Sequence, residues 1–225
     1  GYGPDNETFK QRYDLWRSDV LSFGLGARFS DTDVSEQSAG YIPDRKFYDR
    51  MFGPKGWKAI TIRSLSIGQG EILVTPLQLA NQAAVIANKG YYITPHLLKN
   101  EELKTHKHPV AIDSVYFDVV HEGMHAVMTN GTGRWFNIDS LGMCGKTGTA
   151  QNPHGDDHAI FMGFAPMDNP KIAVAVIVEN AGFGATWAAP IASLMMEQAC
   201  NDTIQRTYLY DRIANAVINP DVKRR

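Results

Sequence analysis

A lysine and a threonine lie between two glycines at residues 145–148, within the stretch MCGKTGTAQN at 143–152. Lysine pairs with a phosphate or with a carboxylate, so the surrounding residues decide which anion the segment suits. A phosphate-binding loop needs a glycine five positions before Gly145, where this chain has Ser140. A loop and a β-hairpin are predicted to follow, rather than the helix whose N-terminus would hold a phosphate. The segment therefore favours a carboxylate.

The same residues suit an edge strand of a β-sheet. Side chains alternate along a strand, so we expect Lys146 and Gly148 on one face. Lys146 would project its charge into a cleft, and Gly148 would let the backbone of an added peptide strand lie close. The backbone N–H of Thr149 would face a developing oxyanion. A solvent-facing lysine that guards a sheet edge is the structural alternative.

A second pattern, HEGMH at 121–125, matches the His-Glu-x-x-His signature of zinc peptidases. The extended form of that signature needs Gly at 128 and His at 131, where this chain has Met128 and Gly131. We favour a helix with a solvated polar face instead. That polar face would contain Asp118, His121, Glu122, His125 and Thr129. The buried arc would contain Val115, Tyr116, Phe117, Val119, Val120, Met124, Val127 and Met128.

The stretch HGDDH at 154–158 places two histidines and two aspartates in one loop. These side chains are possible metal ligands, but we favour a polar loop that borders the cleft. Gln151 and Asn152 are closer to Lys146 in the sequence, and they are the predicted substrate contacts. No metal ligand is predicted.

These residues need a scaffold of helices and a short antiparallel sheet. The runs at 159–166 and 171–180, joined by the turn MDNP, predict a hairpin that is covered on both faces. Helices are expected over 6–22, 75–90, 113–129 and 186–204, with residues 27–60 irregular. Gln78 is expected to be structural, and Phe183 and Trp187 are expected in the core. The predicted fold class is α+β, an antiparallel sheet flanked by helices.

The composition of the chain narrows its function. Apolar residues make up 44% of the 225 residues and charged residues 20%, which is typical of a globular protein. The net charge of −2 argues against a nucleic-acid partner. No apolar run is long enough to span a bilayer. The two cysteines, Cys144 and Cys200, are interpreted as free thiols rather than a bridge.

Several stretches resemble class B penicillin-binding transpeptidases, and within them the cell-elongation members. The resemblance rests on GKTGTAQN, on FMGFAP at 161–166 and on SIGQGEILVTPLQLANQAAVIANKGYYITPHLLK at 66–99. It implies a sheet of five antiparallel strands flanked by helices. Residues 1–204 would then be the C-terminal portion of an incomplete penicillin-binding, serine β-lactamase-like domain. Residues 205–225 would form an amphipathic tail.

The family carries its chemistry on three motifs, which are Ser-x-x-Lys, Ser-x-Asn and Lys-Thr/Ser-Gly. Only the third is here, as Lys146-Thr147-Gly148, because no serine has lysine at +3 or asparagine at +2. We therefore expect a C-terminal part of a longer transpeptidase, inactive alone. The resemblance implies that Lys146 attracts the substrate carboxylate and that Thr147 supports its pocket. It further implies that Gly148 admits the substrate backbone. The Thr149 hydroxyl would bond the carboxylate, and the Thr149 backbone N–H would donate to the oxyanion.

The resemblance also implies the ligands and the location of the parent protein. These ligands would be a peptidoglycan stem peptide that ends in D-Ala-D-Ala, and β-lactam antibiotics. Membrane proteins of the elongation complex would be partners, and no cofactor or nucleic acid is expected. An N-terminal anchor would hold the parent at the periplasmic face of the inner membrane. The alternatives are a non-catalytic binding or interaction module on the same fold and the zinc peptidase described above.

Overall fold

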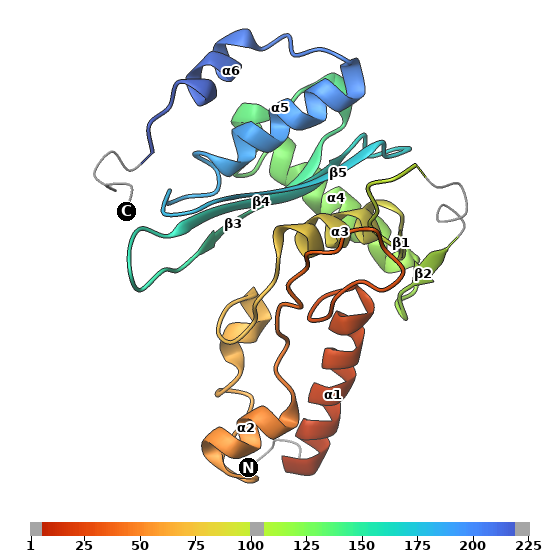
Figure 1. The fold of residues 1–225 in the computed structure, drawn as a ribbon, viewed down its shortest axis with the longest axis vertical. Coiled ribbons are helices and arrows are strands. Elements are labelled where there is room, and N and C mark those ends of the chain that lie inside the picture. The colour runs from red at the N-terminus through yellow and green to blue at the C-terminus, as the bar shows by residue number, and fades with distance from the viewer. Residues whose placement is uncertain (1–5, 100–105, 219–225) are drawn as a thin grey trace. The chain divides into compact units, whose positions relative to one another are not determined.

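A computed structural model describes residues 6–99 and 106–218 of the chain. The chain divides into two compact units (Figure 1). One unit runs to Gln78 and takes in Tyr91–Ile112, and the other contains Leu79–Gly90 and the chain from Asp113. No helix in the described ranges is both long enough and apolar enough to cross a membrane.

The first unit is built around buried aromatic rings. Its elements are α1 (Asn6–Ser22), α2 (Arg45–Phe52), the 3₁₀ helix η1 (Arg63–Ile67) and the antiparallel strands β1 (Tyr91–Ile93) and β2 (Lys107–Pro109). Tyr13, Tyr48 and Trp57 pack together, and the rings of Tyr13 and Trp57 meet edge to face at 5.4 Å. The helix predicted over 6–22 is confirmed, and residues 27–60 are irregular apart from α2.

The helix predicted over 75–90 is α3 (Pro76–Ala87), and it begins with a reciprocal cap. The Thr75 hydroxyl accepts the Gln78 amide at 3.2 Å, while Gln78 Oε1 accepts the Thr75 amide at 3.1 Å. Gln78 Nε2 also donates to the carbonyls of Ala27 and Ala39 at 2.8 and 2.9 Å. Gln78 is therefore structural, as predicted, because it joins the helix start to the irregular segment.

The second unit holds a three-stranded antiparallel sheet in the order β3–β4–β5 (Figure 1). The strands are β3 (Cys144–Ala150), β4 (His158–Ala165) and β5 (Ile172–Val178). The other elements are α4 (Val115–Thr129), the 3₁₀ helices η3 (Arg134–Phe136) and η4 (Asp139–Leu141), α5 (Ala188–Asn201) and α6 (Thr207–Ala214). The α+β class and the β4–β5 hairpin are confirmed. In the described residues this sheet has three strands, where the resemblance implies five.

Helix α5 covers one face of the sheet. Ala159, Phe161 and Ala165 alternate along β4 and are fully buried on that face. They pack in one cluster with Val174 and Val176 of β5 and with Ala188, Ala192 and Met196 of α5. Pro190 lies in the first turn of α5, where the helix does not need its amide.

The packed face of α4 differs from the prediction. Its buried side chains are Phe117, His121, Met124 and Met128, which follow one helical stripe. His121 is only 2% exposed, and its ring lies 4.8 Å from the ring of Phe164 on β4. Its Nε2 also bonds the Ile86 carbonyl at 2.7 Å. The prediction of a solvated His121 is wrong, because this hydrogen bond satisfies the imidazole inside the core.

Several apolar side chains predicted in the core are exposed instead. On α4 they are 40–70% exposed and comprise Val115, Tyr116, Val119 and Val120. Phe183, in the segment before α5, is 73% exposed, so its predicted place in the core is also wrong. The helix meets the sheet along a single stripe, whereas a count of apolar residues predicted a broader buried arc.

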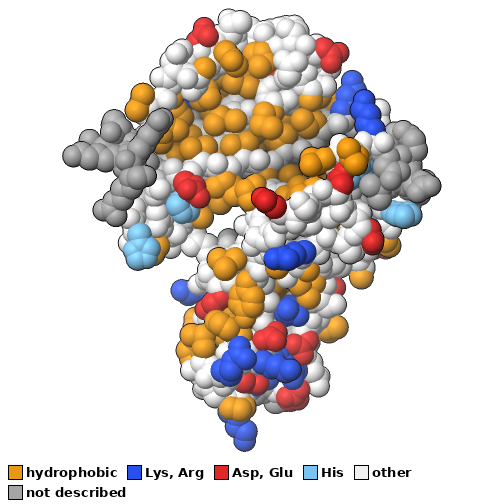
Figure 2. All heavy atoms as spheres, viewed as in Figure 1, with side chains coloured by type: hydrophobic (Ala, Val, Ile, Leu, Met, Phe, Trp, Pro, Cys, Tyr) orange, Lys and Arg blue, Asp and Glu red, His pale blue; other side chains and the backbone are white. Residues whose placement is uncertain are grey.

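The outward surface of α5 and β5 is apolar. Figure 2 shows hydrophobic side chains gathered over these two elements. A hollow of about 490 Å³ lies there, and its lining includes Ile172 of β5, Ile191 and Leu194 of α5, and Ile213 of α6. The predicted coverage of both faces is met by α5 on the face of Phe161 and by α4 on the opposite face, where the His121 ring lies against Phe164. The hollow on the outward side of α5 stays open.

A buried ion pair fixes the start of α6 to α5. Glu197 is 1% exposed, and its Oε2 lies 2.9 Å from Nε of Arg206. The guanidinium of Arg206 also donates to the Phe136 carbonyl at 3.0 Å and to the Ser193 hydroxyl at 2.7 Å. The Gln205 amide donates to the other carboxylate oxygen of Glu197 at 3.0 Å. This network sets the position of α6 against η3 and α5.

Candidate active site

The Lys-Thr-Gly segment lies on β3, which is an edge strand within the described residues. Its pairing with β4 is regular, with Lys146 opposite Met162 and Gly148 opposite Ile160. Lys146 and Gly148 therefore share one face, as predicted, and the threonines between and after them face the other way. The strand leads into a loop and then into β4, so the segment is not a phosphate-binding loop, as the sequence predicted.

Lys146 and Thr147 meet at the open edge of β3. The Lys146 side chain is exposed, and its ammonium donates to the Thr147 carbonyl at 2.6 Å. In an antiparallel pair, alternate residues of an edge strand turn their N–H and C=O groups away from the neighbouring strand, and Thr147 is one of these residues. The ammonium therefore lies along the edge where an added strand would bind.

A threonine that sequence reasoning missed completes this edge. The Thr132 hydroxyl lies 2.7 Å from the Thr147 hydroxyl, and it comes from the turn between α4 and η3. Thr132 lies between two glycines in the stretch NGTG at 130–133, which is typical of a turn. The hydroxyl gives no sequence signal of its own, because threonines are common in turns.

Another segment of this chain lies close to β3 at Gly148, whereas the approach of a substrate backbone there stays a prediction. A side chain added at Gly184 would collide with the carbonyl oxygens of Gly148 and Ile160. A Cβ added at Gly148 would stand 3.4 Å from Ile160 Cβ, which is ordinary contact. The residue that the close approach requires to be glycine is therefore Gly184. The exposed ring of Phe183 precedes it.

The loop after β3 is organised by Asn152. Its side-chain amide donates to Asn180 Oδ1 at 2.6 Å, and its side-chain oxygen accepts the His154 amide at 3.0 Å. Its backbone amide donates to Asp157 Oδ1 at 3.1 Å. The Asp157 carbonyl in turn accepts amides from 181 and 182. The loop between β3 and β4 is thus tied to the segment between β5 and α5, and Gln151 is exposed beside it.

The two histidines of HEGMH bond separate backbone carbonyls. His121 bonds Ile86 as described above, and His125 Nδ1 lies 3.0 Å from the Met143 carbonyl. Glu122 is exposed on the surface of α4. Among residues 6–99 and 106–218, no group of three or more His, Cys, Asp or Glu side chains is arranged to hold a metal ion. These histidines therefore support the core, and the geometry does not favour the zinc peptidase.

The two cysteines are both free, as interpreted from the sequence. Cys144 is fully buried at the start of β3, and burial raises the pKa of its thiol to about 12. Burial also raises the pKa of Cys200, which is only half-buried. The reactive species is the thiolate, so access and pKa both protect Cys144.

In the folded chain we expect a thiol-specific disulfide reagent to modify Cys200 well before Cys144. An unfolded thiol ionises near pH 8.5, whereas folded Cys144 keeps its proton to about pH 12. The contribution of Cys144 to stability is therefore full below about pH 8.5 and is lost as the pH rises toward 12. Mass spectrometry of peptides after timed modification measures both rates. Equal rates at the two cysteines at pH 8 would contradict this prediction.

Comparison with known proteins places this geometry in context. Residues 8–197 match the family described as the penicillin binding protein transpeptidase domain. The chain is 33% identical to the peptidoglycan D,D-transpeptidase MrdA of Haemophilus influenzae, over 89% of this chain and 34% of that protein. It is 30% identical to the peptidoglycan D,D-transpeptidase PbpA of Mycobacterium tuberculosis, over 83% of this chain and 39% of that protein. The chain thus spans little more than a third of either relative.

Two solved structures share the fold. One is Pseudomonas aeruginosa PBP2 in complex with WCK 5153, which matches 87% of this chain with a TM-score of 0.73 and 33% identity. The other is the ceftriaxone acyl-enzyme complex of penicillin-binding protein A from M. tuberculosis, with a TM-score of 0.69 and 28% identity over 86% of this chain. The matched parts are 44% and 46% of those chains. More than half of each solved chain therefore lies outside the comparison.

Proposed function

Because this chain belongs to the penicillin-binding protein transpeptidase family, we propose that β3 forms the Lys-Thr-Gly side of a peptidoglycan D,D-transpeptidase site. The observation that carries the proposal is the exposed Lys146 ammonium on the open edge of β3. Its ligands are a stem peptide that ends in D-Ala-D-Ala and the β-lactam antibiotics. The elongation-complex partners and the periplasmic location stay predictions.

The substrate peptide adds to the edge of β3 as an extra strand. Lys146 exchanges its bond to the Thr147 carbonyl for the terminal carboxylate, because a charged acceptor makes the stronger hydrogen bond. The paired hydroxyls of Thr132 and Thr147 border the same place, and Thr147 supports the carboxylate pocket. Gly148 leaves room for the substrate backbone, and the backbone N–H of Thr149 donates a hydrogen bond to the oxyanion. Gln151 and Asn152 border the peptide further along the strand.

The proposed reaction is acyl transfer through a serine ester. The serine oxygen bonds the carbonyl carbon of the D-Ala-D-Ala amide, the C–N bond breaks, and the serine proton leaves with the D-Ala amine. An amine of a second peptide then forms the cross-link and returns a proton to the serine. The acyl-enzyme complex of the mycobacterial relative supports this route. No serine of these 225 residues has lysine at +3, so we propose that residues upstream supply the nucleophile.

We expect this chain alone to remain unlabelled by a fluorescent penicillin, since it holds no Ser-x-x-Lys motif. The same chain extended upstream in its reading frame through both serine motifs, here called the extended polypeptide, should be labelled to about one equivalent. Denaturing gel fluorescence and intact mass measure both. Stoichiometric labelling of the chain alone would contradict the division of the site. Failure of the folded extended polypeptide to react would contradict the proposed function itself.

A non-catalytic binding module is the second candidate, and it is favoured by the same lack of a nucleophile in this sequence. In that case the extended polypeptide would bind penicillin or peptide reversibly and form no ester. The labelling experiment separates the candidates, because only the transpeptidase retains the label after denaturation.

A further inference from the structure

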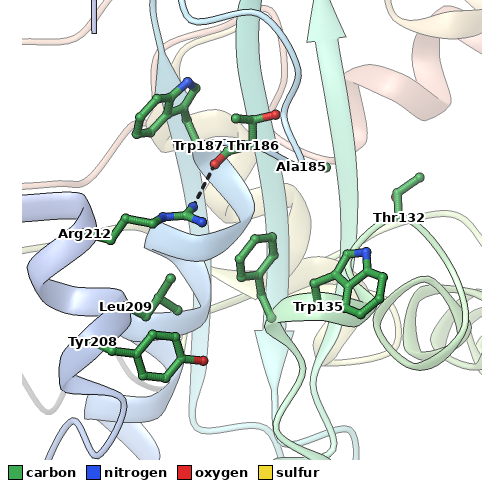
Figure 3. Close-up of a pocket in the computed structure, with 9 residues that line it drawn as sticks. Thr132, Trp135, Ala185, Thr186, Trp187, Tyr208, Leu209 and Arg212 are labelled. Carbon is green, nitrogen blue, oxygen red and sulfur yellow. Dashed lines mark hydrogen bonds between the residues drawn. The ribbon is translucent and has the colours of Figure 1, made fainter. Parts of the chain in front are cut away.

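A groove of about 750 Å³ opens beside Thr132 in the second unit. Figure 3 shows Arg212, Leu209 and Tyr208 of α6 on one side and Trp135 and Thr132 on the other. The groove adjoins the proposed site, because Thr132 lines the groove and its hydroxyl also bonds the Thr147 hydroxyl. A ligand on β3 can therefore extend into it.

The walls of the groove present two large aromatic side chains to solvent. Trp135 is 74% exposed and Tyr208 is 70% exposed. The guanidinium of Arg134 lies 4.7 Å from the Trp135 ring and supports it. Exposed aromatic rings at a concave site mark a binding surface, since each offers a large apolar contact at little entropic cost.

Arg212 gives the groove its charge. It is the single charged residue among those that line the groove, and its guanidinium donates to the Thr186 carbonyl at 3.2 Å. Within the described part of the chain no carboxylate pairs with it. A guanidinium has five N–H donors, so donors beyond the one bonded to Thr186 are available for a carboxylate. The groove therefore suits an anion with an apolar stem.

The groove is also held in shape before any ligand arrives. The Phe136 carbonyl, behind the groove, accepts hydrogen bonds from Arg206 and from the Ser193 hydroxyl. Arg206 is itself paired with buried Glu197, so η3, α5 and α6 are joined at one point. A site with fixed walls loses little conformational entropy on binding.

We propose that this groove is a second subsite, which takes a carboxylate-bearing side branch of the peptide that lies along β3. The carboxylate pairs with Arg212, and the aliphatic stem of the branch packs between Trp135 and Tyr208. A branch that carries an amine and no carboxylate binds more weakly, because its charge has the same sign as that of Arg212. This inference rests on the proposed function and specifies which part of the substrate, besides its terminal carboxylate, the chain recognises.

The test compares two peptides that end in D-Ala-D-Ala and differ at one upstream side chain, which is a free carboxylate or its carboxamide. We expect the chain to bind the carboxylate peptide roughly tenfold tighter by calorimetry. Arg212→Met should remove this preference and leave the affinity for the carboxamide peptide unchanged. Trp135→Ala, at an exposed position, should weaken both peptides and keep the preference. Lys171→Met, which changes an exposed lysine outside the groove, is the matched control.

The variants separate this subsite from the proposed function. Lys146→Met should weaken both peptides equally, since both end in the same terminal carboxylate. A tenfold preference that survives Arg212→Met overturns the subsite and leaves the proposed function intact. A preference that depends on Arg212, with no effect of Lys146→Met, supports the subsite and contradicts the role of Lys146. Absence of binding of either peptide at millimolar concentration contradicts both.

Discussion

Replacing Lys146 with methionine is expected to slow acylation of the extended polypeptide by benzylpenicillin roughly 10- to 100-fold. Methionine keeps the length of the side chain and removes the ammonium that the proposed site offers to the ligand carboxylate. A hydrogen bond to a charged group is worth about 1.5–3 kcal/mol, and 1.4 kcal/mol is a factor of ten. Stopped-flow measurement of the second-order acylation rate tests the prediction.

The role of the charge is isolated by the ligand as well as by the variant. With a β-lactam whose carboxylate is converted to a neutral amide, the wild type and Lys146→Met should react at similar rates. Lys146→Arg should retain most of the preference for the carboxylate, because it keeps the positive charge. An equal loss with both ligands would show that Lys146 acts on the chemistry of the nucleophile and not through the carboxylate.

Arg206→Met is expected to lower the free energy of unfolding by about 3–5 kcal/mol, as for other buried pairs broken on one side. Glu197 is 1% exposed, so removal of Arg206 leaves its carboxylate buried without a counter-charge. The Phe136 carbonyl and the Ser193 hydroxyl lose a donor in the same step. Chemical denaturation of the chain, followed by circular dichroism, measures the change.

Two further variants show whether the buried charge is the cause. Glu197→Gln combined with Arg206→Met should recover part of the loss, because an amide costs less to bury than a carboxylate. Lys89→Met removes an ion pair in which Lys89 and Asp118 are 50% and 57% exposed, and it should change stability far less. If Arg206→Met and Lys89→Met unfold at the same denaturant concentration, the buried pair does not stabilise the fold as argued.

Local sequence patterns predicted the elements that depend on local physics. The pattern Thr75-x-x-Gln78 places a capping box, and the structure contains both of its hydrogen bonds. The turn MDNP between two apolar runs predicts a hairpin, and the structure pairs β4 with β5 as its two strands. Lys146 is predicted on a strand because a hairpin, rather than a helix, follows its glycine-flanked segment, and the structure places it on β3.

The remaining features depend on partners that are distant in sequence. His121 is buried because Ile86 offers a carbonyl and Phe164 a ring, neither of which its own helix reveals. Thr132 joins the candidate site only through Thr147, which follows it by 15 residues. The exposed valines of α4 have the same cause, since a helical wheel counts apolar residues but does not say where the sheet ends. Tertiary contacts therefore decide which of these side chains are buried and which lie at the site, and the periodicity of the sequence does not reveal those contacts.

The hydrogen bonds of Asn152 and Asp157 join the loop between β3 and β4 to the segment between β5 and α5, so the two move together beside the candidate site. The Asn180 side chain accepts a hydrogen bond from Asn152 in the loop between β3 and β4. The Asp157 carbonyl accepts hydrogen bonds from the amides of 181 and 182 in the segment between β5 and α5. A substitution that breaks these hydrogen bonds on one segment should therefore raise the mobility of the other as well.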